Sequence, residues 1–393
     1  MNQPSDFLPP PESPPPPEFA EQFPVLGEMV FLNHAGVAPM SGPAADALRE
    51  YARQASSSAY VDAGWYRRAH EVKALAARLI GAAGPHEIAL IPNTSTGLSL
   101  VAKGLDWRPG DRAVITNVEY PANRYPWEDL KRFGVEVVEV AQRADGRIDA
   151  EEVCDAVNER TRVVSVSQVQ YASGFCLDVS PIADAVHRVG GYLCVDAIQS
   201  CGVRPVDVEA AGIDFLSADG HKWMLGPEGL GFFYCRAERC AALHPNVVGW
   251  MNMVDAGNYG DYRFEFQADA RRFEPGTWNV PGFLALGASL DLLLGVGSAG
   301  VWSRVEALTA RLCAGLEDRG YTVFSPRERE SERSGIVVFE PGPAGGGVDP
   351  RRVVFDLQQA GIVVALREGR LRASPHFYNT PQQMDRLVAA LPG

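Results

Sequence analysis

The sequence predicts an α/β protein with a mainly parallel, doubly wound sheet, followed by a smaller α+β part. From about Glu87 onward, short β-branched runs alternate with helical segments. Such alternation favours parallel pairing, because each connection crosses back over the sheet. The expected strands are Val114–Asn117, Val135–Val140, Val163–Val166, Tyr192–Val195 and Asp214–Ser217, and the expected helices between them are Asn123–Phe133, Ala150–Val157 and Pro181–Val189.

The region before this alternation begins with a proline-rich, acidic stretch, Met1–Pro17. We expect residues 1–22 to form an unstructured, partly polyproline-like arm, with order beginning near Phe23. The run Val30–Gly36 is typical of a short strand that continues into a loop. Two helices are expected next, Ser41–Gln54 with Ser41 as its cap, and Tyr66–Ile80.

The region after the alternation begins with Leu230–Cys235, which follows the preceding strand too closely for a crossover helix and should pair antiparallel. The aromatic, glycine-rich segment Trp250–Thr277 is typical of an active-site or interface loop. The expected later elements are helices Pro281–Leu294, Val301–Arg319 and Pro350–Ala360, strands Gly335–Phe339, Ile362–Leu366 and Leu371–Ala373, and a final helix capped by Thr380. We therefore expect a large domain over 23–280, with 23–45 near the active site, and a small domain over 281–393.

Composition excludes several classes of function. The net charge of −13 argues against binding to a nucleic-acid backbone. The seven cysteines show no metal-ligand spacing, so we expect no metal site, and their odd number favours a reducing cytoplasm. With no basic start and no apolar stretch at the N-terminus, we expect neither a secretion signal nor a membrane span.

Lys222 lies in Ser217–Gly231, a turn rich in Gly, Trp and Pro between two apolar, strand-like runs. A surface lysine does not need such a turn. A lysine whose amine must reach a fixed carbon atom needs it, because the strand end and the tight turn limit where the amine points. This is how a protein holds an aldehyde cofactor as a Schiff base.

Ligands of open α/β sheets bind at the carboxyl ends of strands, and two further candidates lie at such ends. Asp196 closes an apolar strand, where a protonated pyridine nitrogen would serve as its partner; the alternative is a helix N-cap. Tyr120 follows another strand and would stack on a planar ring, although a plain core position explains it equally well.

Anion-binding groups complete the set. Ser95 and Thr96 lie in a hydroxyl-rich turn before a helix, which suits a phosphate, although such a turn is often only a cap. His221 neighbours Lys222 and would touch the phosphate or the ring. Arg372 lies in an apolar strand, where it would bind a substrate carboxylate or pair internally with Glu368. Together, on successive strand ends, these groups predict a pyridoxal phosphate site.

The sequence resembles the class V aminotransferase family of pyridoxal-phosphate enzymes, which includes cysteine desulfurases, selenocysteine lyases and isopenicillin N epimerase-like proteins. The stretches that carry the resemblance are FLNHAGVAP, NTSTGLSLVAKGL, EYPANRYPW, VDAIQ, SADGHKWMLGPEGLGFFY, RFEPGT and LRASPHFYNT, and they span the chain from about Phe31 onward. The resemblance implies the aspartate-aminotransferase-like fold, with a mainly parallel, seven-stranded sheet in the large domain. It also implies a homodimer with active sites at the subunit boundary.

The resemblance assigns roles by position. It makes Lys222 the Schiff-base lysine, Asp196 the partner of the pyridine nitrogen and Gln199 the neighbour of the ring hydroxyl. It places Thr277 against the phosphate of the partner subunit and Arg372 on the substrate carboxylate. Its remaining site positions are Ser95, Thr96 and His221 at the phosphate, Tyr120 at the ring, and Asn33, His34 and Tyr171 on the substrate side.

The sequence departs from relatives at four positions. Cysteine desulfurases have a histidine in place of Tyr120, and they carry a catalytic cysteine on a loop that corresponds here to Val363–Arg370, which is short and lacks cysteine. Persulfide chemistry of that kind is therefore not expected. Asp219 replaces a small hydroxyl residue near the phosphate, so we expect it to turn away or to bond the backbone. Tyr171 replaces an asparagine over the ring.

We expect a pyridoxal-phosphate-dependent enzyme of aminotransferase type that acts on a small, carboxylate-bearing amine, with Lys222, Asp196 and Tyr120 as its catalytic residues. The alternatives are a C–S or other β-eliminating lyase, an epimerase, and a protein that binds the cofactor without turnover.

Overall fold

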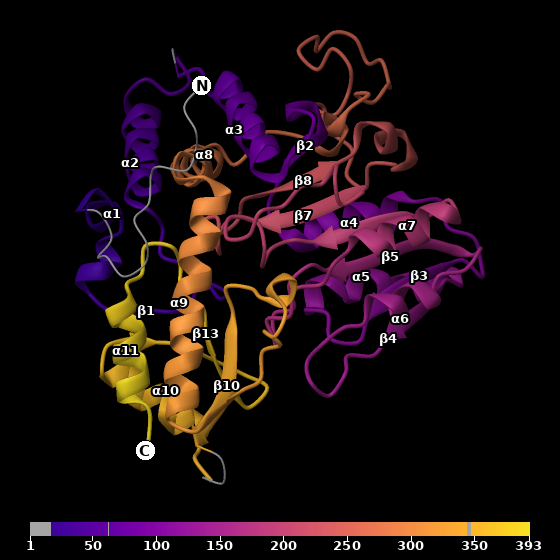
Figure 1. Cartoon of the computed structure of the whole chain (residues 1–393). Coiled ribbons are helices and arrows are strands. Elements are labelled where there is room, and N and C mark those ends of the chain that lie inside the picture. Colours follow the sequence, from indigo (N-terminus) through magenta and orange to yellow (C-terminus); the bar gives the residue numbers. More distant parts are fainter. Residues whose placement is uncertain (1–16, 62, 344–346) are drawn as a thin grey trace, which may run out of the picture.

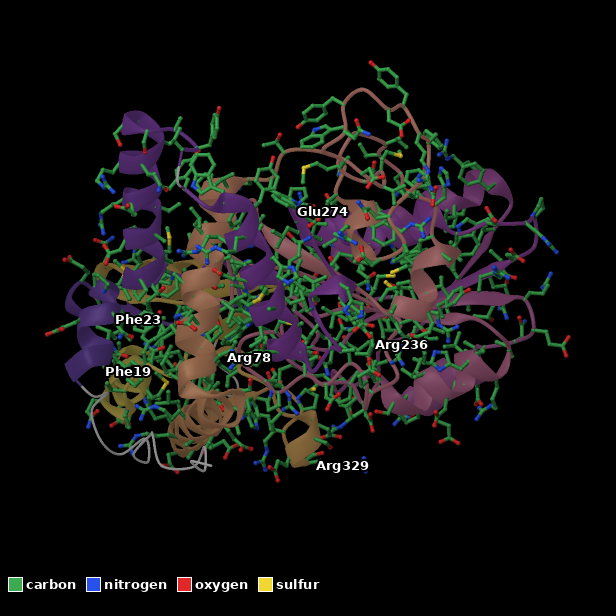
Figure 2. The ribbon with its side chains drawn as sticks, turned by 90° about the horizontal axis from the view of Figure 1, so that it is seen from above. Phe19, Phe23, Arg78, Arg236, Glu274 and Arg329 are labelled. Atoms are coloured by element: carbon green, nitrogen blue, oxygen red, sulfur yellow. The ribbon has the colours of Figure 1, made fainter. Side chains whose placement is uncertain are left out.

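The computed structural model describes residues 17–61, 63–343 and 347–393 (Figure 1). Most of the arm expected over 1–22 therefore lies outside the described residues. Its last residues, Pro17–Gln22, form helix α1, so the expectation that order begins only near Phe23 is wrong. Phe19 packs edge-on against Phe377 at 5.5 Å between ring centres, and Phe23 stacks on Tyr378. Both phenylalanines, labelled in Figure 2, thus attach this segment to the C-terminal part of the chain.

A seven-stranded sheet forms the centre of the larger part, with the strand order β2-β8-β7-β6-β5-β3-β4. Strand β8 is antiparallel to β7 and β2, and all other neighbours pair in parallel. This confirms the expected mainly parallel sheet and its antiparallel strand. The strands are β2 (Ile88–Ile91), β3 (Arg112–Thr116), β4 (Glu136–Val140), β5 (Thr161–Ser167), β6 (Tyr192–Asp196), β7 (Phe215–Asp219) and β8 (Gly231–Cys235).

Both faces of this sheet are buried. Along β5, for example, Val163 and Val164 belong to two different apolar clusters, because successive side chains of a strand point to opposite faces. One cluster includes side chains of helices α3 (Trp65–Ile80), α6 (Ala150–Asp155), α7 (Ser180–Arg188) and α8 (Val280–Val296), and the other includes side chains of α4 (Thr94–Gly104) and α5 (Tyr125–Glu128). Burial of both faces explains why the strands are continuously apolar.

The single helix expected over Asn123–Phe133 is divided. The structure has 3-10 helices η3 (Pro121–Asn123) and η4 (Asp129–Phe133) on either side of the short α5. Pro121 and Pro126 lie in first turns of these pieces, since a proline has no N–H to continue a preceding helix. The other 3-10 helices are η1 (Pro24–Gly27), η2 (Pro85–Glu87), η5 (Ala237–Ala242), η6 (Ala270–Phe273) and η7 (Glu330–Glu332).

The C-terminal part contains a four-stranded antiparallel sheet with the order β12-β13-β10-β9. Its elements are α9 (Ser298–Asp318), β9 (Tyr321–Val323), β10 (Val337–Pro343), α10 (Pro350–Gln359), β11 (Ile362–Val363), β12 (Ala365–Arg367), β13 (Arg370–Ala373) and α11 (Pro381–Ala390). Strand β1 (Val30–Phe31) pairs in parallel with β11. The N-terminal segment, which was expected to belong to the large domain, is therefore joined by its strand to the C-terminal part.

Helix α8 packs against α3 and α2 (Gly42–Ser57), as Figure 1 shows, so it extends the larger part beyond the boundary expected after residue 280. Among the described residues, no single helix is long and apolar enough to cross a membrane. Helices α8 and α9 pass that test only together, as a pair bent by 80°. Residues Phe283, Leu286 and Leu290 of α8 are buried in the core of the larger part.

Candidate active site

A cavity of about 500 Å³ lies where the carboxyl ends of β2, β3, β6 and β7 face the N-terminal segment and the β12–β13 hairpin. These four strands run in the same direction, because β2 and β7 both oppose β8. Their ends therefore meet at one edge of the sheet. The predicted residues that line the cavity are Asn33, Ser95, Tyr120, Tyr171, Asp196, Gln199, His221, Lys222 and Arg372.

The turn after β7 fixes the backbone of Lys222. The N–H of Gly220 donates to Leu230 O and that of Gly226 to Gly220 O, at 2.9 Å each. Within the turn, Leu225 adopts a positive φ of 58°, and its N–H donates to Lys222 O at 3.0 Å. A left-handed leucine costs free energy, so the surrounding packing holds this turn in one shape. The lysine therefore starts from a rigid base.

The amine of Lys222 differs from every other lysine amine in the chain. The sequence has four lysines. Lys73, Lys103 and Lys131 each form an ion pair with a carboxylate, whereas Lys222 has no hydrogen bond or ion pair with any described residue. Its Nζ lies 5.6 Å from the centre of the Tyr120 ring. Burial lowers the pKa of Lys222 to about 8, and the charge of Asp196 partly opposes this shift.

Asp196 is the last residue of β6 and is almost fully buried. Its Oδ1 accepts a hydrogen bond from the N–H of Ile198 at 3.0 Å, and no helix begins there, so the helix N-cap alternative is wrong. Burial, supported by the nearby charge of Glu119, raises the pKa of Asp196 to about 7. A carboxylate in this position lacks a compensating cation.

Glu119 is a buried carboxylate that the sequence analysis missed. Five donors bind it: Thr116 Oγ1, Asn123 Nδ2, the N–H and Oγ of Ser167, and Gln170 Nε2, at 2.5–3.3 Å. It precedes Tyr120 and links the loop after β3 to the end of β5. Like Asp196, it is an acidic residue close to the carboxyl end of an apolar strand, and that pattern would have revealed it.

Tyr120 is not a core residue, because 47% of it is exposed and it lines the cavity. Its ring packs edge-on against Tyr171, with 5.2 Å between ring centres. Two aromatic rings therefore form one wall of the cavity. Gln199 lines the opposite part: its Nε2 donates to Ala35 O and its Oε1 accepts from Trp223 Nε1, which ties the N-terminal segment to the lysine turn.

The turn between β2 and α4 presents Thr94 and Ser95 to the cavity, and Asn93 caps the helix. Thr96 does not line the cavity, because its N–H and hydroxyl both donate to Asn93 Oδ1. The assignment of Thr96 to the phosphate is therefore not supported, and Thr94, which was missed, takes its place beside Ser95. The helix N-terminus contributes a favourable dipole for an anion.

Asp219 lines the cavity, and its Oδ1 accepts a hydrogen bond from the N–H of Gly220 at 2.8 Å, which fits the expectation that it would bond the backbone. Its Oδ2 lies 3.2 Å from His221 Nδ1 without the alignment of a hydrogen bond. The N–H of Asp219 donates to Thr94 Oγ1, so the lysine turn and the helix start are directly joined.

Arg372 is almost fully buried and forms no ion pair with a described residue, so the internal pair with Glu368 is not formed. Its Nη1 donates to Tyr171 O at 3.0 Å and its Nη2 to Asn33 Oδ1 at 3.4 Å, while its Nε has no partner. Burial and the charge of Arg367 lower the pKa of Arg372 to about 9. Glu368 instead accepts from the hydroxyl of Tyr171.

Besides Thr96, two predicted residues lie away from the cavity. His34 is buried, and its ring nitrogens bond Ser374 O and the hydroxyl of Tyr378, so a direct substrate contact is not supported. Burial holds the pKa of His34 well below its ordinary value, so the ring is neutral. Thr277 is exposed and does not line the cavity of its own chain. Among the described residues, no group of three or more His, Cys, Asp or Glu side chains is placed to hold a metal ion.

These groups fit pyridoxal 5′-phosphate. Lys222 supplies an unpaired amine for its aldehyde carbon, and the start of α4 supplies hydroxyls and N–H groups for its phosphate. The strongest indication is Asp196, a buried carboxylate at the cavity without an ion pair to any described residue, because a protonated ring nitrogen is the cation that it lacks. The fold and the site therefore define a pyridoxal-phosphate-dependent enzyme.

The sequence matches the family described as Aminotransferase class-V over residues 30–387, and the chain belongs to this family. A probable cysteine desulfurase of Methanothermobacter thermautotrophicus is 33% identical over 94% of this chain and 95% of its own length. An uncharacterized aminotransferase of Bacillus subtilis, YcbU, is 28% identical over 95% of this chain and 96% of its own length.

Solved structures share the fold. The apo cysteine desulfurase from Thermococcus onnurineus NA1 has a TM-score of 0.86 at 24% identity and covers 96% of this chain and 97% of its own. The cystine C-S lyase C-DES, in complex with its product cysteine persulfide, has a TM-score of 0.85 at 22% identity and covers 94% of this chain and 98% of its own. At these sequence identities the structural similarity is evidence for the fold alone, and it confirms the fold that the sequence predicted.

Proposed function

We propose that this enzyme is of aminotransferase type and acts on a small amino acid through its α-carboxylate. One observation carries the proposal: Lys222, whose amine is unpaired, and Arg372, whose buried Nε has no partner, line the same cavity. The first group can react at an α-carbon and the second can bind the neighbouring carboxylate.

Each residue has a definite task in this proposal. Arg372 binds the substrate carboxylate and so orients the α-carbon, while Asn33 and Tyr171 O hold the guanidinium in place. The amine of Lys222, with its pKa lowered to about 8, is partly neutral near pH 8 and can accept the α-proton. The rings of Tyr120 and Tyr171 form a wall that keeps water from one side of the cavity. When bound, the cofactor supplies an electron-accepting ring that stabilises negative charge on the α-carbon.

Transamination suits these groups because it would need one residue to take a proton from the substrate α-carbon and return it at the other side of the connecting nitrogen. Lys222 is the residue with an amine in the cavity. None of the described residues that line the cavity is a cysteine. Five of the seven cysteines are buried elsewhere, and Cys154 and Cys313 lie away from the cavity. The groups present therefore give no support to a mechanism that needs a nucleophilic thiol.

A β-eliminating lyase is the second candidate, and the names of relatives favour it. The relative with 33% identity is a probable cysteine desulfurase, and elimination from a sulfur-bearing amino acid does not itself require a thiol in the enzyme. Lys222 would take the same proton in both reactions. The two candidates therefore differ in what leaves the substrate.

The test is a spectrum followed by a panel of amines. The purified protein should absorb in the near-violet, and Lys222→Ala should lose that band, whereas Lys131→Ala, at an exposed ion pair, should keep it. Mixing with amino acids then separates the candidates. Release of a keto acid with conversion to the pyridoxamine form supports the proposal, pyruvate with ammonia indicates the lyase, and racemised substrate indicates an epimerase. No response to any amine would contradict all three and favour a binding protein.

We also propose a homodimer, in which Thr277 reaches the phosphate of the partner subunit. The segment around residues 250–264 exposes four aromatic side chains, Trp250, Tyr259, Tyr262 and Phe264, with Tyr262 96% exposed. An apolar patch of this kind commonly marks an interface. Light scattering gives the mass in solution, and a monomer with full cofactor affinity would contradict this arrangement.

A further inference from the structure

Strands β12 and β13 form a hairpin that carries three arginines on one face. Arg372 pairs with Ala365 and Arg370 pairs with Arg367 in the antiparallel register. Alternate residues of a strand share a face, so Arg367, Arg370 and Arg372 lie on the same side, with Arg367 and Arg372 as diagonal neighbours roughly 7–8 Å apart at Cα.

The turn of this hairpin fixes where Arg367 lies. Only Glu368 and Gly369 connect the strands, and both have positive φ, at 49° and 80°. A two-residue loop with two positive φ angles matches the right-handed twist of a hairpin and holds its register. Arg367 is therefore held on a short strand end and is not part of a long loop.

The three arginines have different partners. Arg370 donates to Glu340 Oε1 at 2.8 Å, and its guanidinium lies over the Phe324 ring, away from the cavity. Arg367 and Arg372 both line the cavity, and neither forms an ion pair with any described residue. Arg367 makes one hydrogen bond, from Nη1 to Leu366 O at 2.7 Å, which leaves most of its donors for a ligand.

The carboxylates of the cavity do not neutralise these two guanidinium groups. Asp196 accepts from the N–H of Ile198 and Asp219 from the N–H of Gly220, and neither forms an ion pair with an arginine, while Glu368 does not line the cavity and accepts from Tyr171. Arg367 and Arg372 lie near each other on one face of the hairpin, and the charge of Arg367 adds to the effect of burial, the larger cause, in lowering the pKa of Arg372. Two like charges held on one face are unfavourable unless anions join them.

We propose that the substrate is an amino acid whose side chain ends in a second carboxylate, which Arg367 binds while Arg372 binds the α-carboxylate. The inference rests on the proposed function for the role of Arg372. It makes Arg367 a specificity-determining residue. The rival arrangement is one substrate carboxylate shared by both arginines.

The test compares acidic substrates with neutral ones of the same shape in the holoenzyme. The pairs are aspartate and asparagine, and glutamate and glutamine; the pair that reacts identifies the length of the side chain. We expect kcat/KM to favour the acid, and Arg367→Gln to lower it by about 10- to 100-fold for the acid while changing the neutral partner little. Arg367→Lys should restore part of the preference. Arg370→Gln removes the same charge from the same face outside the cavity and should leave the preference intact.

Calorimetry with unreactive anions gives an independent readout. Succinate should bind the holoenzyme more tightly than butyrate, and Arg367→Gln should remove that difference. If Arg367→Gln weakens succinate and butyrate equally, both arginines share a single carboxylate and the inference is overturned. It is also overturned if the wild type prefers neutral amino acids. If succinate binds through Arg367 but no amino acid reacts, Arg367 binds a second carboxylate as inferred and the proposed function fails.

Discussion

Asp196 and Lys222 line the same cavity with opposite charges, yet they do not form an ion pair. Each shifts the pKa of the other toward its charged form, and in each residue burial has the larger, opposite effect. A direct ion pair would satisfy both groups and close the space between them. Their separation leaves room for a ligand that contacts both, which is the arrangement that a ring with an aldehyde and a basic nitrogen requires.

The first prediction concerns the reactivity of Lys222 in cofactor-free protein. Because burial lowers its pKa to about 8, its amine should react with an acylating reagent at a lower pH than an ordinary lysine, whose pKa is about 10.4. Peptide mass spectrometry over pH 6–11 gives the profile, with exposed Lys131 as the reference for reagent access. Asp196→Asn should lower the pKa of Lys222 further, since the charge of Asp196 raises it. An apparent pKa near 10.4 would contradict the assigned environment.

The second prediction concerns the pH dependence of stability in cofactor-free protein. The pKa of Asp196 rises from 3.8 to about 7 on folding, so between these values the folded state holds a proton that the unfolded state has lost. The contribution of this residue to stability is therefore present below about pH 4 and is lost as the pH rises to about 7. Asp196→Asn removes this pH-dependent loss of stability, because an asparagine side chain does not titrate. It keeps the oxygen that accepts the hydrogen bond from the N–H of Ile198.

We expect the Asp196→Asn protein to equal the wild type near pH 4 and to be more stable by roughly 1–3 kcal/mol near pH 8, measured by urea unfolding without cofactor. The cofactor should reverse the order, because the variant cannot compensate a protonated ring nitrogen. A variant that is less stable than the wild type at pH 8 without cofactor would show that Asp196 already has its cation within the protein.

Much of this site was predictable from the sequence because it follows from strand ends. The runs before Tyr120, Asp196 and Lys222 are recognisable as buried strands, and parallel strands bring their carboxyl ends to one edge. The sheet order required more than local pattern, but the antiparallel β8 followed from the short connection before it. Backbone geometry alone therefore predicts that Tyr120, Asp196 and Lys222 lie at the same edge of the sheet.

The residues that the sequence placed differently from the structure depend on contacts that a local pattern does not show. His34 bonds Tyr378, and this long-range contact removes it from the cavity although its neighbour Asn33 remains there. The N–H and the hydroxyl of Thr96 donate to Asn93, which caps the helix. The sequence does not show whether these groups bind the cap or a phosphate, because it does not fix the residue at which the helix begins. Arg367 was missed because its importance depends on the register of the hairpin, which sets it beside Arg372.

The third prediction separates carboxylate binding from reaction. Arg372→Ala should weaken amino acid substrates by about 100-fold or more in kcat/KM, since a buried bidentate partner is lost, while amines without a carboxylate lose far less. The comparison of an amino acid with its decarboxylated amine, for wild type and variant, gives the selectivity directly. Equal losses for both would remove Arg372 from the substrate and assign it a structural role.

The fourth prediction concerns a buried ion pair that positions the segment containing Thr277. Lys73 Nζ lies 2.5 Å from Glu274 Oε2, and Glu274 Oε1 accepts the N–H of Leu90 at 2.8 Å, so one carboxylate joins α3, β2 and the start of that segment. Glu274, which is labelled in Figure 2, is almost fully buried. Burial raises the pKa of Glu274 despite the lysine, which shows that its charge is held at a cost.

Removing one partner leaves the other charge buried, so Lys73→Met should destabilise the protein by about 3–5 kcal/mol, and Lys73→Met with Glu274→Met should cost less than the sum of the two single changes. Urea unfolding of the four proteins measures this coupling. Lys131→Met breaks an exposed ion pair with Glu128 and should change stability by no more than about 0.5 kcal/mol. Additive single changes would mean that Lys73 and Glu274 act independently. In that case the ion pair could not be what holds the Thr277 segment against the sheet.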